Sequence, residues 1–273
     1  WSHSYSPITI KPGIPSIFQF PQYGSGLPLP VISVSGASPL MERTASARSG
    51  FQAAKFHGKD AQAECPIGMI GISANSPIHD SEITGLASTR TKLFEAMPTT
   101  GLPHVLKNYS EFQKFMRTLI RARTIESIRE VWWDIRPHPG FGTVEIRAFD
   151  AVPSINEIVN IAAFSQCLIT AISDHYDDGT QLPILDRWIN SENKWLASRY
   201  GLDAKIIIDD VGEPKPLRSE ITSTIDKLLP LAHKLKCVNE LLNLREYVEK
   251  SQSPYLRQLK IYEETQEFIP ILK

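Results

Sequence analysis

The chain has 273 residues, 42% of them hydrophobic, which is enough to bury a substantial core in one large domain or two small ones. Its formal net charge is −1 and its basic residues are interleaved with acidic ones, which disfavours a nucleic-acid partner. The three cysteines, Cys65, Cys167 and Cys237, form no C-x-x-C pair and no disulfide framework, which indicates a reducing, cytoplasmic compartment.

Membrane spans and common nucleotide-binding motifs are not visible in the sequence. The longest apolar run, 155–172, is interrupted by polar residues, and no charged start with an apolar core marks a secretory signal. The sequence contains no G-x-G-x-x-G, G-x-x-x-x-G-K-[ST], H-E-x-x-H or G-x-S-x-G. We therefore expect no membrane partner and neither a Rossmann nor a P-loop enzyme.

The composition changes near residue 68. Residues 1–68 are dense in proline, glycine and serine and hold only short β-like pieces, such as 31–34. From residue 69 the chain becomes orderly. We predict an atypical N-terminal segment, 1–68, followed by an ordered domain, 69–273.

Several helices are predicted after that boundary. Capping boxes that begin at Ser110 and Ser154 predict helices over 110–123 and 154–173. The first has an apolar stripe, and the second is apolar over most of its circumference. Further helices are expected over 186–199, 219–229, 231–250 and 254–268, with a break at Pro230 and a short strand over 205–208. Two tryptophans in the helix over 186–199, Trp188 and Trp195, are expected in the core.

A β-hairpin is predicted between the two capped helices. Residues 131–136 are aromatic and β-branched, 137–142 hold two prolines and two glycines, and 143–149 are β-prone again. If Arg136 pairs with Thr143, alternation places Asp134 opposite Glu145 and Trp132 opposite Arg147. The other face carries four apolar residues that the helix over 154–173 should cover: Trp133, Ile135, Val144 and Ile146.

The charged face of this hairpin allows two interpretations. Two opposed carboxylates repel each other, whereas a divalent cation would take their oxygens as ligands. The flanking arginines suit a phosphate or a carboxylate, which they can bind through two parallel hydrogen bonds. A solvated face with ordinary arginine–carboxylate pairs is the alternative, and the spacing leaves both open.

These residues also carry a resemblance. The run from Trp133 to Pro139, then Gly142 to Arg147 and Asp150, resembles the W-D-[IV]-R-P-x-P…T-[VL]-E-[IV]-R…D signature of carboxylate–amine ligases related to glutamate–cysteine ligase type 2. The S-A-x-S-P…T-G…S-x-R and R-Y-G-L motifs of that family match in the same order, at Ser73–Arg90 and Arg199–Leu202. The similarity extends from about residue 69 to the C-terminus.

The resemblance implies an α+β fold with a glutamine-synthetase-like antiparallel sheet, helices packed on one face, and ATP and Mg²⁺ on the other. It implies an ATP-dependent ligase that forms a C–N bond. The γ-carboxylate of glutamate becomes an acyl phosphate, which an amine such as cysteine then attacks. The implied partners are these small molecules and, as in many family members, a second copy of the chain.

Site residues follow by matching motifs. The resemblance makes Glu145 a magnesium ligand, and it makes Arg147 a contact to phosphate or acyl-phosphate oxygens. Arg136 becomes a second cation for nucleotide or substrate, and Asp134 either binds the metal or holds Arg136.

The S-x-R and T-G motifs supply the remaining site residues. Arg90 is the implied contact to a substrate carboxylate, with Ser88 and Thr84 in the same substrate-binding stretch.

The sequence departs from the family pattern at its start. The family's G-[VI]-E-x-E and H-V-H-V-G strands, which supply further metal and substrate ligands, are not found in residues 1–68. Two hypotheses follow. The chain is an active carboxylate–amine ligase, or it is a catalytically incomplete member that acts as a non-enzymatic binding or structural protein.

Overall fold

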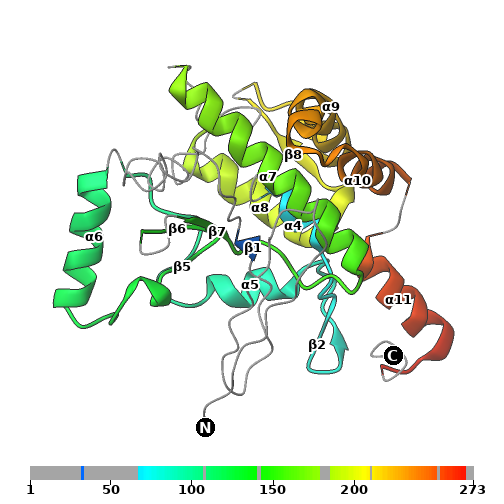
Figure 1. The fold of residues 1–273 in the computed structure, drawn as a ribbon. Helices are drawn as coiled ribbons and strands as arrows, with labels where there is room; N and C mark the ends of the chain where they lie inside the picture. The colour runs from blue at the N-terminus through cyan, green and yellow to red at the C-terminus, as the bar shows by residue number, and fades with distance from the viewer. Residues whose placement is uncertain are drawn as a thin grey trace, which may run out of the picture.

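The computed structural model describes residues 32–33, 67–106, 109–139, 143–178, 185–209, 211–250 and 253–268. Long helices and short strands mix within them, so the predicted α+β class is confirmed (Figure 1). The glutamine-synthetase-like arrangement stays a prediction, as does the boundary at residue 68. In chain order the elements are β1 (Ile32–Ser33), α4 (Gly68–Ser73), β2 (Ile78–His79), β3 (Glu82–Ile83), α5 (Thr89–Glu95), β4 (Thr100–Gly101), α6 (Tyr109–Arg121), η3 (Ile128–Glu130), β5 (Trp132–Trp133), β6 (Ile135–His138), β7 (Thr143–Ile146), α7 (Ile155–Asp177), α8 (Arg187–Tyr200), η4 (Gly201–Asp203), β8 (Lys205–Ile207), β9 (Pro214–Pro216), α9 (Leu217–Leu235), α10 (Val238–Lys250) and α11 (Pro254–Thr265).

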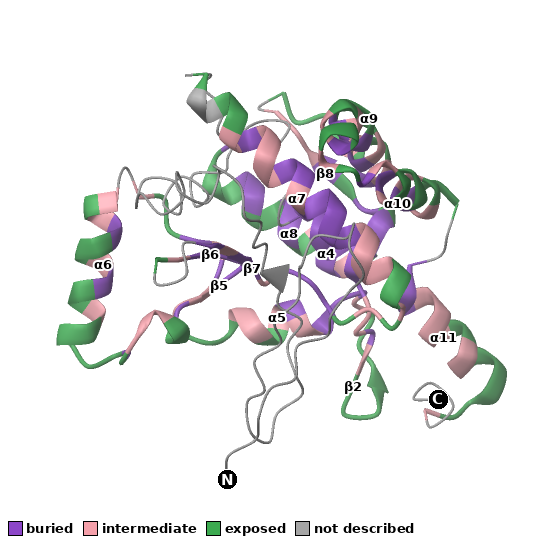
Figure 2. Ribbon diagram, in the orientation of Figure 1, coloured by how far each residue is buried: buried purple, intermediate pink, exposed green. Residues whose placement is uncertain are grey.

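Helix α4 lies inside the main core, and all six of its residues are buried. It packs against α8, α9 and η4, while α7, α9 and α10 pack on one another (Figure 2). A Cβ at Gly71 would lie 2.6 Å from Cδ2 of Leu217 and 3.3 Å from the carbonyl oxygen of Gly201. The close approach of α4 to α9 and η4 therefore depends on the absence of a side chain at position 71.

The hairpin belongs to an antiparallel sheet with the strand order β1-β7-β6. Ile135 and Ile146 are buried in the same core cluster as Phe164 of α7, so their predicted burial is confirmed, while direct cover by this helix stays a prediction. Trp133 was expected there too, but it packs with Phe112 in a second cluster under α6. The strand is interrupted at Asp134, and β5 pairs in parallel with β4 instead of with β7. This interruption turns Trp133 to a different core.

The predicted register of the hairpin is wrong by two residues. Arg136 lies opposite Glu145, and His138, not Arg136, lies opposite Thr143. The first strand continues through Pro137, which is tolerated because β6 is an edge strand of its sheet. A shift of two residues keeps every side chain on its predicted face. It replaces the expected pair of opposed carboxylates with an arginine–glutamate pair.

Helices α6 and α7 match their predicted positions closely. Helix α6 begins at Tyr109, so Ser110 lies inside its first turn and is not the cap that the sequence predicts. Its apolar stripe is confirmed, since Phe112 and Met116 are buried and Phe115 and Leu119 pack beside them. Helix α7 begins at Ile155, as its capping box predicts, and runs to Asp177.

The predictions for α8 and α9 need correction. Trp188 and Trp195 of α8 are 60% and 42% exposed and do not lie in the core. Helix α9 continues through Pro230 and ends at Leu235, and the next residue, Lys236, has the left-handed backbone of a helix C-cap. Pro230 lies on the exposed face, so the carbonyl that loses its helical hydrogen bond can be hydrated. The buried stripe of α9 continues on both sides of the proline, with Ile225 and Ala232 among its members.

One helix among the described residues is long and apolar enough to cross a membrane, by length and composition alone. It is Ile155–His175 of α7. The sequence predicts no membrane span there, because polar residues interrupt the apolar run. Within the fold, 44% of its most apolar 18-residue stretch is buried, and α7 contributes Ile161, Phe164 and Leu168 to the main core. A core helix of a soluble protein passes the same test, so this stretch is weak support for a membrane span.

Candidate functional site

The polar face of the β6–β7 hairpin holds a buried charge cluster. Glu145 is 8% exposed and uses both carboxylate oxygens. Arg136 Nη2 donates to one oxygen, and Arg147 Nη1 donates to the other at 2.9 Å. Strand alternation and register produce this arrangement, because Arg136 stands opposite Glu145 and Arg147 follows Glu145 by two residues, directly after the end of β7.

Arg136 is bound almost entirely by the protein itself. Its Nη1 donates to the carbonyl oxygens of Ile128, Arg129 and Val131 at 2.8, 3.0 and 3.1 Å, and the side chain is 5% exposed. These carbonyls belong to the short helix η3 and the residue that follows it. In this position Arg136 orients Glu145. Its Nε has no hydrogen-bond partner among the described residues, but both of its terminal nitrogens are engaged, and its side chain is less exposed than those of Arg147 and Arg90.

Arg147 and Arg90 are the more available cations. Arg147 lies over the ring of Trp132 at 5.8 Å, and Arg90 lies over that of Phe94 at 4.9 Å. Arg90 Nη2 donates to the Arg147 carbonyl at 2.9 Å, which joins α5 to the end of β7. Burial lowers the pKa of both arginines, although nearby carboxylates oppose that shift. Neither Nε has a hydrogen-bond partner among the described residues, so a bound oxyanion could satisfy both.

Ser88 is close to this cluster but serves another carboxylate. It caps helix α5, and its hydroxyl donates to Asp150 at 2.9 Å. Asp150 also accepts from the Ser76 hydroxyl at 2.7 Å and the Asn75 amide at 2.9 Å, and it lies 3.7 Å from Arg90. Ser88 and Asp150 therefore fix the start of α5, and through it the position of Arg90.

Thr84 lies outside this buried group. It follows the exposed β2–β3 hairpin, and its hydroxyl lies 2.6 Å from that of Thr89 and 3.0 Å from the Pro77 carbonyl oxygen. Its link to Arg90 therefore runs through Thr89, the neighbouring residue in α5. The structure brings six of the seven predicted residues to one region and places Thr84 at its edge.

Lys194 is the residue that sequence reasoning missed. It comes from α8, is 1% exposed, and donates to Asp134 at 2.6 Å while lying 2.8 Å from Glu95. Glu95 also pairs with Lys92 at 2.6 Å. Burial alone would raise the pKa of Glu95, but the two lysines lower it below its ordinary value. A lysine in a helix 60 residues after its partner carries no sequence signal for this contact.

The described residues alone do not fit a magnesium site. Both oxygens of Glu145 bind arginines, and the nearby Asp134 is held by Lys194. No group of three or more histidine, cysteine, aspartate or glutamate side chains suited to a metal occurs in the described part of the chain. The same charges fit an anion better, because arginines outnumber the carboxylates that face them.

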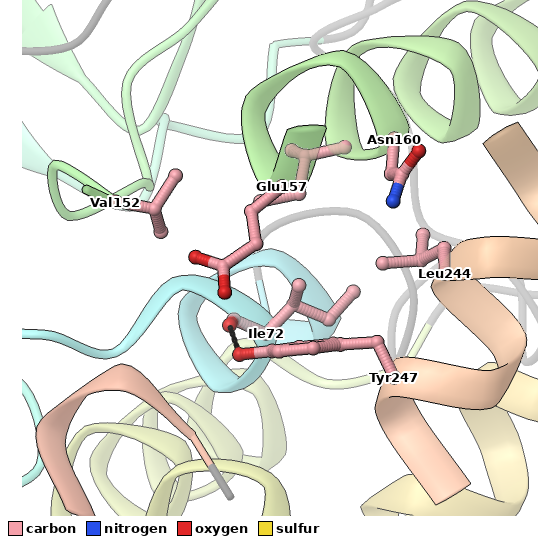
Figure 3. A pocket seen from close by; sticks show the side chains of 7 residues that line it. Ile72, Val152, Glu157, Asn160, Leu244 and Tyr247 are labelled. Atoms are coloured by element: carbon pink, nitrogen blue, oxygen red, sulfur yellow. Dashed lines mark hydrogen bonds between the residues drawn. The ribbon is translucent and has the colours of Figure 1, made fainter. Parts of the chain in front are cut away.

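A small cavity lies elsewhere, between α4, α7 and α10 (Figure 3). It has about 10 Å³ of space, which is room for about one water molecule and too little for a substrate. The Tyr247 hydroxyl donates to the Ile72 carbonyl at its edge, at 3.2 Å. Its lining residues are Ile72, Val152, Glu157, Asn160, Ile161, Leu244 and Tyr247.

Comparison with known proteins agrees with the motifs. The chain is 48% identical to a Frankia casuarinae protein named "Putative glutamate--cysteine ligase 2-1" over 189 residues, which cover 69% of the chain and 49% of that protein. It is 45% identical to a "Putative glutamate--cysteine ligase 2" from Thermobifida fusca over 192 residues, covering 70% and 48%. A Mycobacterium sp. (strain KMS) relative named "Putative glutamate--cysteine ligase 2-1" is 38% identical over 196 residues, covering 72% and 52%. The chain thus spans about half the length of the curated relatives it matches.

The family assignment rests on a longer match. The sequence model described as "Glutamate-cysteine ligase family 2 (GCS2)" matches residues 60–269. That range contains every residue of the charge cluster, from Arg90 to Lys194. The chain therefore belongs to glutamate–cysteine ligase family 2.

Proposed function

We propose that this chain is an ATP-dependent carboxylate–amine ligase. In the proposed reaction the γ-carboxylate of glutamate takes the γ-phosphoryl group of ATP and releases ADP. An amine then attacks the acyl carbon, a C–N bond forms, and phosphate leaves. The relatives' names support a ligase that joins glutamate to an amine, with cysteine as the first candidate.

The observation that carries this proposal is the convergence of three arginines on two carboxylates. Arg90, Arg136 and Arg147 meet around Glu145 and Asp150. Asp134, the third carboxylate near Arg90, is paired with Lys194, so one positive charge is left without a carboxylate of its own. Phosphoryl transfer needs preorganised cations where negative charge develops. A surplus guanidinium in a largely buried site meets that need.

The proposed roles follow from how freely each side chain can reach a ligand. Arg147 contacts phosphoryl oxygens, since its Nε is unpaired within the described residues and its ring neighbour fixes its plane. Arg90 contacts a substrate carboxylate and Ser88 fixes its helix. Arg136 holds Glu145 in place. We assign no magnesium ligand set from the described residues and no step that passes through the metal.

The location proposed for this protein is the cytoplasm. Cys167 and Cys237 are free and buried, 3.5 Å apart, which suits a reducing compartment.

The test is turnover by the 273-residue chain itself, with ATP, magnesium, glutamate and a panel of amines that includes cysteine. ADP release and the mass of the amide product are measured together. Arg147→Gln should lower kcat about 100-fold, in line with loss of one donor to the developing charge. Arg117→Gln, on the exposed face of α6, is the matched control and should leave the rate unchanged. Absence of both ADP and amide with every amine would refute the proposal and favour a non-enzymatic binding role.

A further inference from the structure

The polar face of the β6–β7 hairpin could form two separate cross-strand ion pairs. Arg136 lies opposite Glu145. If the same register is extended by two residues along each strand, Asp134 stands opposite Arg147. The backbone confirms this neighbourhood, because the Arg147 amide donates to the Asp134 carbonyl at 2.7 Å. Opposite charges directly across an antiparallel pair attract each other. The simplest arrangement would pair each arginine with its own carboxylate and leave no net charge.

The protein has a different arrangement. The Asp134 carboxylate binds Lys194 at 2.6 Å, so it is held by α8 and not by the neighbouring strand. Arg147 lacks that partner and shares Glu145 with Arg136. Its guanidinium therefore carries charge that the strand pair does not neutralise.

Lys194 is in turn held firmly. Its side chain is 2% exposed, and a buried ammonium is strongly destabilising unless carboxylates surround it. Asp134 and Glu95 provide two such partners, and Lys92 balances the second of them. These two lysines and two carboxylates form a charge-neutral group beside the arginines.

We propose that Lys194 is a positioning residue. It binds Asp134 and keeps this carboxylate away from Arg147, which leaves one positive charge among the three arginines of the site for a phosphoryl oxyanion. This inference rests on the proposed function, because it explains how the anion site acquires its charge. Lys194 itself touches neither Glu145 nor Arg147. It acts through the placement of a competing carboxylate.

The experiment compares inorganic phosphate binding by calorimetry in the full chain and three variants. Lys194→Met should weaken phosphate binding about tenfold, because Asp134 is released to pair with Arg147. Adding Asp134→Asn to that variant should restore the affinity to within about threefold of the original chain. Lys250→Met, at a lysine that is 70% exposed, should leave it unchanged. A purely structural role for Lys194 predicts no such rescue, since the second change removes another buried group.

A crystal structure of the Lys194→Met variant separates this inference from the proposed function. Asp134 within hydrogen-bonding distance of Arg147 supports the inference even if the original chain binds no phosphate, a result that would count against the proposed anion site alone. Asp134 still turned away from Arg147 overturns it, and so does an unchanged phosphate affinity in a folded Lys194→Met variant when the original chain binds phosphate. If that variant does not fold, Asp134→Asn alone decides: retained or tighter phosphate binding supports the inference, and tenfold weaker binding overturns it.

Discussion

Replacing Glu145 with alanine should destabilise the fold more than any ordinary loss of an ion pair. The side chains of Glu145 and Arg136 are 10% and 5% exposed, so the removed carboxylate leaves a buried guanidinium behind. Removing one partner of a buried ion pair costs about 3–5 kcal/mol, because the remaining charge is left uncompensated.

The structure places the expected cost at the lower end of that range. Arg136 keeps three hydrogen bonds to the carbonyls of Ile128, Arg129 and Val131, which solvate part of its charge. We expect Glu145→Ala to lower the free energy of unfolding by about 3 kcal/mol. Glu145→Gln retains the shape and one acceptor, so it should lose about 2 kcal/mol, the value of a hydrogen bond to a charged group.

Urea denaturation followed by circular dichroism measures both losses, provided the dependence on urea keeps the same slope in all variants. Glu246→Ala is the matched control. Glu246 pairs with Lys250 at 3.2 Å on the exposed face of α10, with 66% of its side chain exposed, and such pairs contribute about 0–1 kcal/mol. If Glu145→Ala costs no more than this control, the buried pair with Arg136 does not exist as described and the reasoning fails.

Three further predictions concern the core and the response to pH. Gly71→Ala should cost about 1–3 kcal/mol in urea denaturation, because its Cβ would overlap Leu217; a neutral result would show that α4 can move away. Cys167 and Cys237 are both buried, so a thiol reagent should label their peptides only as fast as the protein opens. The hydrogen bond with Cys237 and burial also raise the pKa of Cys167. Rapid labelling in the native state would contradict this. Burial, with nearby Arg136, lowers the pKa of His138 below 6.5, so the unfolded chain binds more protons. Stability should therefore fall as the pH decreases below about 6.5, and His138→Gln should reduce the fall between about pH 7.5 and about pH 5.5; an unchanged slope would exclude His138 as a source.

Local patterns in the sequence predict much of this fold. The stripe from Phe112 to Leu119 gives the buried face of α6, because residues three and four apart share one side of a helix. The alternation around Glu145 gives the correct faces of the hairpin, because a strand repeats every two residues. Both patterns depend only on residues that are close together in the chain, so a single sequence is enough to predict them.

The failed predictions depend on distant parts of the chain. The predicted hairpin register is wrong because Pro137 lies in β6 and not in the turn, and only the sheet order shows that β6 is an edge strand among the described residues. The sequence predicts a helix break at Pro230, but its exposed position leaves the buried stripe of α9 intact. Trp188 and Trp195 are large and apolar, yet the core is filled from other helices and they remain exposed.

The interruption of the first strand at Asp134 connects the fold to the proposed chemistry. A continuous strand would have turned Trp133 to the same core as Ile135, and it would have left Asp134 beside Arg147. With the break, Trp133 packs under α6 and Asp134 reaches Lys194. The break at this residue thus separates the cluster under α6 from the main core, and it leaves a positive charge on the hairpin's polar face. The family signature contains this residue as part of W-D-I-R, and its neighbours Trp133 and Ile135 end one strand and begin the next. A signature of this kind therefore describes a bend in the chain as much as a set of ligands.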